Sequence, residues 1–193
     1  MLPSPTSLSI LVVAATDREL AGAVGVATLR CGVGPVEAAA TTAAAIAISR
    51  PEVVLHVGIA GARRSSGIAP VSLVIGSETR YCDLDLANDW APRTLLTPTA
   101  LVEAARRALP EASVRPIGTS ARVGGTHECD VEAMEGFAVL RAAQLAGVPA
   151  IEVRVVSNEI EEADRARWRF EEAFQAVADA TPRLIAEITA CVS

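Results

Sequence analysis

The chain has 193 residues, of which 51% are hydrophobic and only 3% aromatic, and its formal net charge is −6. This composition excludes a disordered chain, and the lack of a basic patch with interleaved aromatic residues argues against a nucleic-acid partner. The length fits one domain over residues 1–193, with a core of small aliphatic side chains.

The first apolar run, Ser9–Ala15, is too short to cross a bilayer, and no basic segment precedes it. We therefore expect a buried first strand, no membrane partner and a cytoplasmic location. Four widely spaced cysteines and two histidines match no metal pattern, so we expect free thiols, no metal and no cofactor.

Further along the chain, strands and helices alternate. Thr16-Asp17 offers a helix cap before Glu19, and Pro182 is expected to start a second helix within the C-terminal region. The expected strands cover residues 53–57, 71–75, 114–123 and 150–156, the expected helices cover 36–49, 101–109, 135–146 and most of 163–192, and 83–100 is expected to be a loop.

This alternation predicts an α/β fold with helices on both faces of a parallel or mixed sheet. In such sheets, ligands bind beyond the carboxyl ends of the strands. Three polar or glycine-rich features are expected at such ends: Glu19, the segment 58–61 and Ser157-Asn158.

Arg154 interrupts a strand of valines, where a guanidinium is costly unless it is paired. It either forms a salt bridge at an exposed edge or is held by carboxylates in a cleft. Glu135, beside Met134 at a helix start, either complements the helix dipole or accepts two hydroxyl hydrogens from a cis-diol such as ribose. Asn158 is either a turn residue or a hydrogen-bond donor to a base.

Two other residue types carry weaker signals. His56 is more typical of a core or supporting residue than of a ligand, and His127 is expected on an exposed loop. Trp168 and Arg165 either cap the carboxylate-bearing end of a substrate or pack one helix face against the body.

Several segments together resemble the nucleoside phosphorylase/nucleosidase superfamily, over about residues 9–175. They are AATDREL, CGVGPVEAAATTAAAI, VVLHVGIAGA, SLVIGSETRYCDLD, VEAMEGFAV and EVRVVSN. The resemblance implies a three-layer α/β/α sandwich around a mixed, partly barrel-like sheet, and a homo-oligomer with sites near the subunit interface. Within the superfamily, EAMEG and RVVSNEIEEADRARW are most similar to the futalosine hydrolases, which release hypoxanthine from futalosine in menaquinone biosynthesis.

The resemblance also implies roles at matching positions. Glu19 would activate water, Arg154 would hold that water and the Glu19 carboxylate, and Asn158 would face the purine. Met134 and Glu135 would clasp the ribose. The remaining site residues would line the pocket: Ile59, Ala60, Gly61 and Ser157.

Asn158 favours a 6-oxopurine, because its amide can donate to O6 or N7, whereas adenine offers an amino group that needs an acceptor. A methylthioadenosine/S-adenosylhomocysteine nucleosidase is therefore disfavoured. A phosphorylase stays open, because Arg63 and Arg64 follow the GIAGA turn. So does a nucleoside-binding module without turnover, although it has no use for a water-activating carboxylate.

Overall fold

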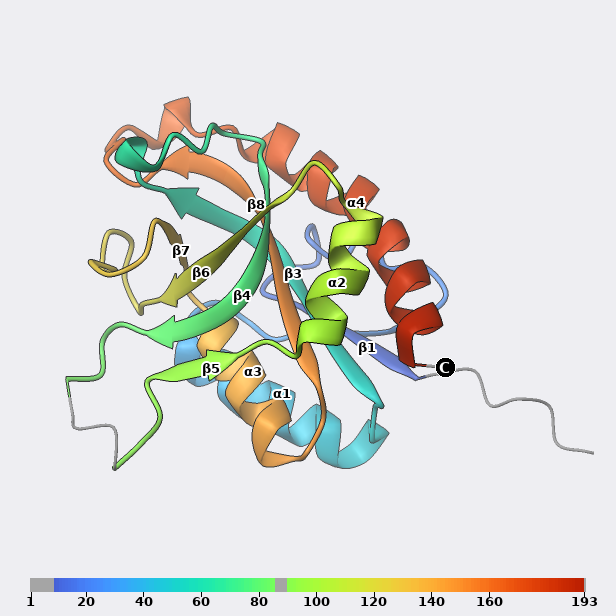
Figure 1. The fold of residues 1–193 in the computed structure, drawn as a ribbon. Coiled ribbons are helices and arrows are strands. Elements are labelled where there is room, and N and C mark those ends of the chain that lie inside the picture. Colours follow the sequence, from blue (N-terminus) through green and yellow to red (C-terminus); the bar gives the residue numbers. More distant parts are fainter. Residues whose placement is uncertain (1–8, 86–89, 193) are drawn as a thin grey trace, which may run out of the picture.

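The computed structural model describes residues 9–85 and 90–192, which form a mixed sheet with helices on both faces (Figure 1). The strands are β1 (Ile10–Ala14), β2 (Ala27–Arg30), β3 (Val53–Ala62), β4 (Leu73–Tyr81), β5 (Thr94–Leu96), β6 (Ser113–Thr119), β7 (Val131–Ala133) and β8 (Ala150–Glu159). The helices are α1 (Pro35–Ser49), α2 (Thr99–Ala108), α3 (Gly136–Leu145) and α4 (Phe170–Val192), with short 3₁₀ turns at Arg64–Ser66 and Arg165–Arg167.

The sheet closes on itself through β8. This strand pairs in parallel with β3 and antiparallel with β4, while β7 and β6 connect β3 to β4 on the other side. Aliphatic side chains, mostly alanine and valine, fill the resulting barrel: Ala60, Ala62, Val74, Ile117, Val131, Ala133 and Val156. The expected mixed, partly barrel-like sheet is confirmed.

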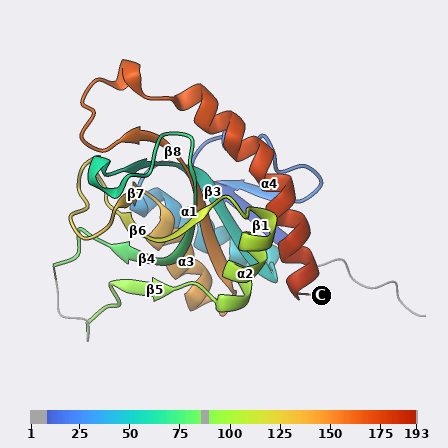
Figure 2. The same ribbon diagram turned by 45° about the horizontal axis from the view of Figure 1, so that its top comes forward.

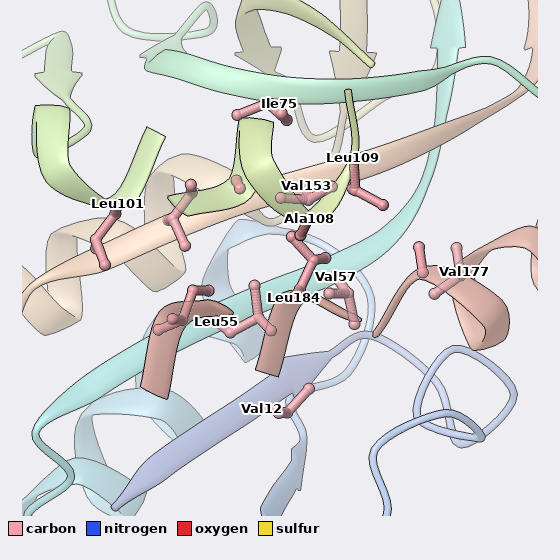
Figure 3. Packing of buried hydrophobic residues seen from close by; sticks show 14 of the residues in the cluster. Val12, Leu55, Val57, Ile75, Leu101, Ala108, Leu109, Val153, Val177 and Leu184 are labelled. Atoms are coloured by element: carbon pink, nitrogen blue, oxygen red, sulfur yellow. The ribbon is translucent and has the colours of Figure 1, made fainter. Parts of the chain in front are cut away.

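Helices cover both faces of the strands, which explains why the strands read as continuous apolar runs. On one face, Val12, Leu55 and Val153 pack against α2 and α4 (Figure 3). On the other face, Leu11 and Val54 pack against α1 and α3. Successive residues of β1 therefore point into different cores, as the strand alternation dictates, and Figure 2 shows α4 running along the α2 side of the molecule.

Three strands run further than the sequence predicts. The glycine-rich segment 58–62 continues β3 and pairs with β8, which itself continues through Ser157 and Asn158. The expectation that the strand 150–156 ends before Ser157-Asn158 is wrong, and so is the turn alternative for Asn158, because the ladder resumes after a register shift at Ala60/Gly61. These site residues are therefore held by backbone hydrogen bonds of the sheet. The segment 78–81 likewise belongs to β4.

Other local predictions are also wrong. Residues 16–22 form turns and bends, so Thr16-Asp17 caps no helix. The strand expected over 114–123 ends at Thr119. The short strands β2, β5 and β7 were not predicted; β5 lies inside the expected loop 83–100, of which residues 86–89 fall outside the described part.

Pro182 does not start a new helix, because α4 runs continuously through it. Proline has no N–H, so the carbonyl four residues earlier, that of Ala178, loses its helical donor. Gly22 packs against this carbonyl: an ideal Cβ on Gly22 would lie 2.2 Å from the Ala178 oxygen. A residue without a side chain thus allows the 16–22 segment to lie flat on α4.

All four cysteines are free thiols. Burial and the nearby Glu135 carboxylate raise the pKa of Cys31 to about 12, so this thiol stays protonated. Within residues 9–85 and 90–192, no helix combines the length and hydropathy that crossing a membrane requires.

We predict that Gly22→Ala lowers the free energy of unfolding by about 1–3 kcal/mol, because the added methyl group overlaps backbone that cannot move aside easily. Urea denaturation followed by circular dichroism measures this loss. The exposed neighbour variant Ala21→Ser serves as the control and should unfold at the wild-type midpoint. Equal midpoints for Gly22→Ala and Ala21→Ser would contradict the packing described here.

Candidate active site

A cavity of about 180 Å³ opens where β1, β3, β7 and β8 meet the following loops. Eight of the site residues expected from the sequence line it: Glu19, Ile59, Ala60, Gly61, Met134, Glu135, Ser157 and Asn158. Arg154, the ninth, is in contact with Glu135 but does not line the cavity itself. Eight further wall residues were not assigned to the site from the sequence or were left open: Ala15, Thr16, Val33, Val123, Glu132, Ala133, Trp168 and Phe174.

Glu19 is buried and held by three hydrogen bonds. Its Oε2 accepts from the Thr16 N–H at 2.9 Å and from the Thr16 hydroxyl at 2.7 Å, and its Oε1 accepts from the Ile59 N–H at 3.0 Å. The Thr-x-x-Glu spacing that suggested a helix cap therefore closes a turn over the sheet. The carboxylate has a fixed position at the cavity wall.

Gly58 lies between the Glu19 carboxylate and the Arg154 guanidinium. An ideal Cβ at Gly58 would come 2.6 Å from Glu19 Oε1 and 2.3 Å from Arg154 Nη1. Both charged groups therefore converge on the space that any side chain at this position would fill. Only glycine leaves that space free for a small polar ligand.

Arg154 is 1% exposed, so the alternative of a salt bridge at an exposed edge is wrong. Its Nε donates to Glu152 Oε1 at 2.7 Å, and its Nη2 donates to His56 Nε2 at 2.5 Å. The same Nη2 lies 3.5 Å from Glu135 Oε2, while Nη1 donates to the Ile59 carbonyl at 3.4 Å. One buried cation is thus shared among carboxylates and a histidine.

His56 and Glu152 support Arg154 from neighbouring strands, since they are register partners on β3 and β8. His56 Nδ1 donates to the Val13 carbonyl at 3.0 Å, which leaves Nε2 as the acceptor for Arg154. Burial and the Arg154 charge lower the pKa of His56 well below its usual value, so the ring stays neutral. Burial raises the pKa of Glu152, and the Arg154 charge opposes that rise.

The expectation that His56 is a core or supporting residue is confirmed, whereas Glu152 received no role from the sequence. A signal was present in both cases. Each is a polar residue inside a buried strand, on the same face as Gly58 or Arg154.

Glu135 links the cavity to the glycine-rich turn before α1. Its Oε1 accepts from the Gly34 N–H at 3.0 Å, and Gly34 has a positive φ of 92° that favours glycine. Its neighbour Gly136 must also be small, because an ideal Cβ there would lie 2.1 Å from Glu152 Oε2. The carboxylate of Glu135 is therefore fixed at the cavity wall, beside Met134.

Hydrogen bonds fix the orientation of the Asn158 amide. Nδ2 donates to the Glu159 carbonyl at 2.9 Å, and Oδ1 accepts from the Ser157 hydroxyl at 2.8 Å. Because a side-chain amide carries two N–H groups, one of them is left over. Asn158 thus presents a hydrogen-bond donor at the cavity.

Charged residues after the GIAGA segment lie elsewhere. Arg63 is 3.9 Å from Glu161, Arg64 is 2.6 Å from Glu159, and neither arginine lines the cavity. His127 is exposed, as expected.

Comparison with known proteins places the chain in a family. The Phosphorylase superfamily profile matches residues 121–192. A futalosine hydrolase of Streptomyces coelicolor is 38% identical over 81% of this chain and 77% of that protein. This chain belongs to the futalosine hydrolase family. A second futalosine hydrolase, from Thermus thermophilus, is 32% identical over 84% of this chain and 82% of its own length.

Solved structures agree with this family assignment at the level of the fold. The futalosine hydrolase of Helicobacter pylori superposes with a TM-score of 0.84 at 17% identity, covering 95% of this chain and 100% of that one. A methylthioadenosine/S-adenosylhomocysteine nucleosidase of Colwellia psychrerythraea, in complex with adenine, gives a TM-score of 0.82 at 20% identity, covering 96% of both chains. The expected α/β/α fold is confirmed.

We predict that this protein becomes less stable in mild acid because His56 is protonated only in the unfolded chain. The folded state holds this ring neutral, whereas a histidine in the unfolded chain binds a proton below its ordinary pKa of about 6.5. Below that pH the free energy of unfolding therefore falls by up to ~1.4 kcal/mol per pH unit. His56→Gln should remove this slope, measured by denaturation between pH 5 and pH 7.

The matched control is His127→Gln, which changes an exposed histidine and should keep the wild-type slope. Protonation of Glu152 changes stability in the opposite direction, because burial raises its pKa in the folded state. The quantity to compare is therefore the difference in the pH slope of the free energy of unfolding between each variant and the wild type. Identical pH dependence of wild type and His56→Gln would contradict a neutral, Arg154-bound His56.

Proposed function

We propose that this protein hydrolyses the N-glycosidic bond of futalosine, giving hypoxanthine and dehypoxanthinylfutalosine in menaquinone biosynthesis. One observation carries the proposal: a single cavity gathers a donor for the base at Asn158, a carboxylate at Glu19 and an acceptor for hydroxyl groups at Glu135. The Arg154 cation lies behind this wall, in contact with Glu135 and close to Glu19 at Gly58. Membership of the futalosine hydrolase family supports the choice of substrate.

Glu19 and Arg154 are assigned to the attacking water. A water molecule beside Gly58 donates one proton to Glu19 Oε1 and accepts a hydrogen bond from Arg154 Nη1. Glu19 then acts as the general base and removes the proton as the oxygen attacks the anomeric carbon. The departing purine anion takes up one proton from solvent to give hypoxanthine, and Glu19 releases its proton to solvent. Its negative charge also stabilises the positive charge that develops on the sugar. The three donors that fix Glu19 support this role, since they hold its free lone pair in one direction.

Asn158 is assigned to the leaving purine, which becomes negatively charged as the bond breaks. Its free N–H donates to O6 or N7 of a 6-oxopurine, and loss of such a donor costs about 2.7–4 kcal/mol in other enzymes. The donors and acceptors that fix its amide support this assignment. They also disfavour adenine, whose amino group requires an acceptor.

Glu135 and Met134 are assigned to the ribose. The Glu135 carboxylate has four lone-pair sites and uses one for the Gly34 N–H and one for Arg154 Nη2, which leaves two acceptors for the two hydroxyl groups of a cis-diol. Met134 supplies an adaptable apolar wall along the sugar. Ile59, Ala60, Gly61 and Ser157 complete the binding surface from β3 and β8.

Phosphorolysis is the nearest alternative, and it requires an anion site built of arginines and backbone amides. Arg63 and Arg64 pair with glutamates away from the cavity, and Arg154 is occupied by Glu152, His56 and Glu135. Water is therefore the favoured nucleophile.

We also propose that the protein works as a homo-oligomer in the cytoplasm, over its single domain of residues 1–193. Large apolar side chains are exposed on α1, β5 and α3, which pack together, and oligomer formation would cover them. They are Val36 at 78%, Ile48 at 86%, Leu96 at 76% and Leu145 at 72% exposed. Free thiols suit a reducing compartment.

A coupled xanthine oxidase assay, run on futalosine and on inosine with and without phosphate, tests the function. We expect hypoxanthine from futalosine at a rate that phosphate does not change. Release that depends on phosphate would instead identify a phosphorylase and would remove the assignment of Glu19 to water.

Glu19→Gln provides the matched control, because it keeps the shape of the side chain but removes the base. An enzyme should lose turnover by roughly 100-fold or more while still binding futalosine. A wild-type protein that binds futalosine with no release of hypoxanthine would point to a binding module.

A further inference from the structure

A second groove, of about 480 Å³, adjoins the active-site cavity. The two share Ala15, Thr16 and Val33 as wall residues, so they adjoin at the turn after β1. Beyond this junction, the groove is lined by two arginines, Arg18 and Arg30, together with other polar groups. Nothing in the proposed hydrolysis of the glycosidic bond uses it.

The direction of the substrate follows from the proposed function, on which this inference rests. Asn158 takes the base at one end of the cavity. Glu135 takes the ribose hydroxyls and is bonded to Gly34, which places the sugar beside the turn that holds Val33. The 5′ substituent of the ribose therefore leaves away from Asn158, past Val33 and Thr16, and enters the groove.

Futalosine carries a carboxylated aromatic ring on its 5′ side, joined through a short ketone chain. Val33 is 58% exposed at the junction and offers an apolar surface to such a ring. We propose that the groove binds this 5′ extension and that Arg30 pairs with its carboxylate. Arg30 thereby distinguishes substrates with a 5′ carboxylate from simple nucleosides.

Arg30 has more free donors than the other arginines nearby. Arg18 is held by a short ion pair with Glu171, and its guanidinium stacks 4.2 Å over the Phe174 ring. Arg165 stacks on Trp168 at 5.5 Å and does not line the groove. Arg30 has one long contact, at 3.4 Å to Asp17 Oδ2, among the residues that the structure describes.

Asp17 competes with the substrate for Arg30, since it is also in the groove and 78% of its side chain is exposed. An aryl carboxylate that reaches Arg30 can form a bidentate pair, which the present 3.4 Å contact does not provide. Glu37 adds a further negative charge to the same wall. The groove thus has both the cation that binds a carboxylate and acidic residues that weaken binding.

Steady-state kinetics on three substrates test the proposal: futalosine, its carboxyl methyl ester, and inosine. Arg30→Gln should raise KM for futalosine roughly tenfold, equivalent to about 1.4 kcal/mol, and leave kcat unchanged. The same variant should behave like wild type on the ester and on inosine, because neither has a 5′ carboxylate. Asp17→Asn should lower KM for futalosine alone.

Two control variants sharpen the test. Arg106→Gln removes an exposed arginine on α2 and should change nothing, and Arg165→Gln probes the arginine that stacks on the cavity residue Trp168. Three results would overturn the proposal while hypoxanthine release still supported the function. They are a wild-type KM for Arg30→Gln, an equal rise of KM on all three substrates, and a rise of KM for futalosine alone in Arg165→Gln. If wild type releases no hypoxanthine from futalosine, the function and this inference both fail.

Discussion

A buried guanidinium with three carboxylates around it is the constraint on which this structure depends. Arg154 is almost fully buried, pairs with Glu152 and Glu135, and faces Glu19 across Gly58. Removing such a charge from water costs several kcal/mol, which pairing only partly offsets. A pair of apolar residues would pack at a lower free-energy cost. We therefore interpret the cluster as a group of charges that acts on a ligand.

The closed sheet explains how these groups come together. Because β8 pairs with β3 over its whole length, His56, Gly58 and Ala60 lie beside Glu152, Arg154 and Val156 in fixed register. Glycines at 58 and 136 then leave room for the side chains of their neighbours. The Thr16–Glu19 turn bonds to the sheet through Glu19 and the Ile59 N–H, and the Gly34 turn donates its N–H to Glu135. Backbone geometry, rather than flexible side chains, thus sets the positions of the reacting groups.

Much of this arrangement was predictable from the sequence. The predictions that were wrong failed for physical reasons. Long apolar runs identified β1, β3 and β8, and the alanine-rich segment identified α1, because burial on both faces leaves a strong pattern. The strand 150–156 was expected to stop before Ser157-Asn158 because these residue types favour turns, yet sheet pairing overrides that preference. Pro182 was predicted to break α4, but the helix runs through it, and Gly22 packs against the Ala178 carbonyl that Pro182 leaves without a helical donor.

The residues of the site were easier to predict than their environment. Glu19, Glu135 and Asn158 stood out through the resemblance to a family, whereas the support of Arg154 by His56 and Glu152 depends on strand register. Register depends on contacts between distant segments, which a local pattern does not contain. The groove beside Arg30 was not predicted for the same reason, since it forms between the β1 turn and the start of α1.

Futalosine turnover by Arg154→Lys tests most directly whether the geometry of the guanidinium, and not its charge alone, organises this site. A lysine keeps the positive charge but cannot donate simultaneously to Glu152, His56 and the Ile59 carbonyl along the directions of a planar fork. The account predicts that kcat falls by roughly 100-fold in a protein that remains folded. A lysine variant with wild-type kcat would contradict it, because charge without fixed geometry would then be sufficient.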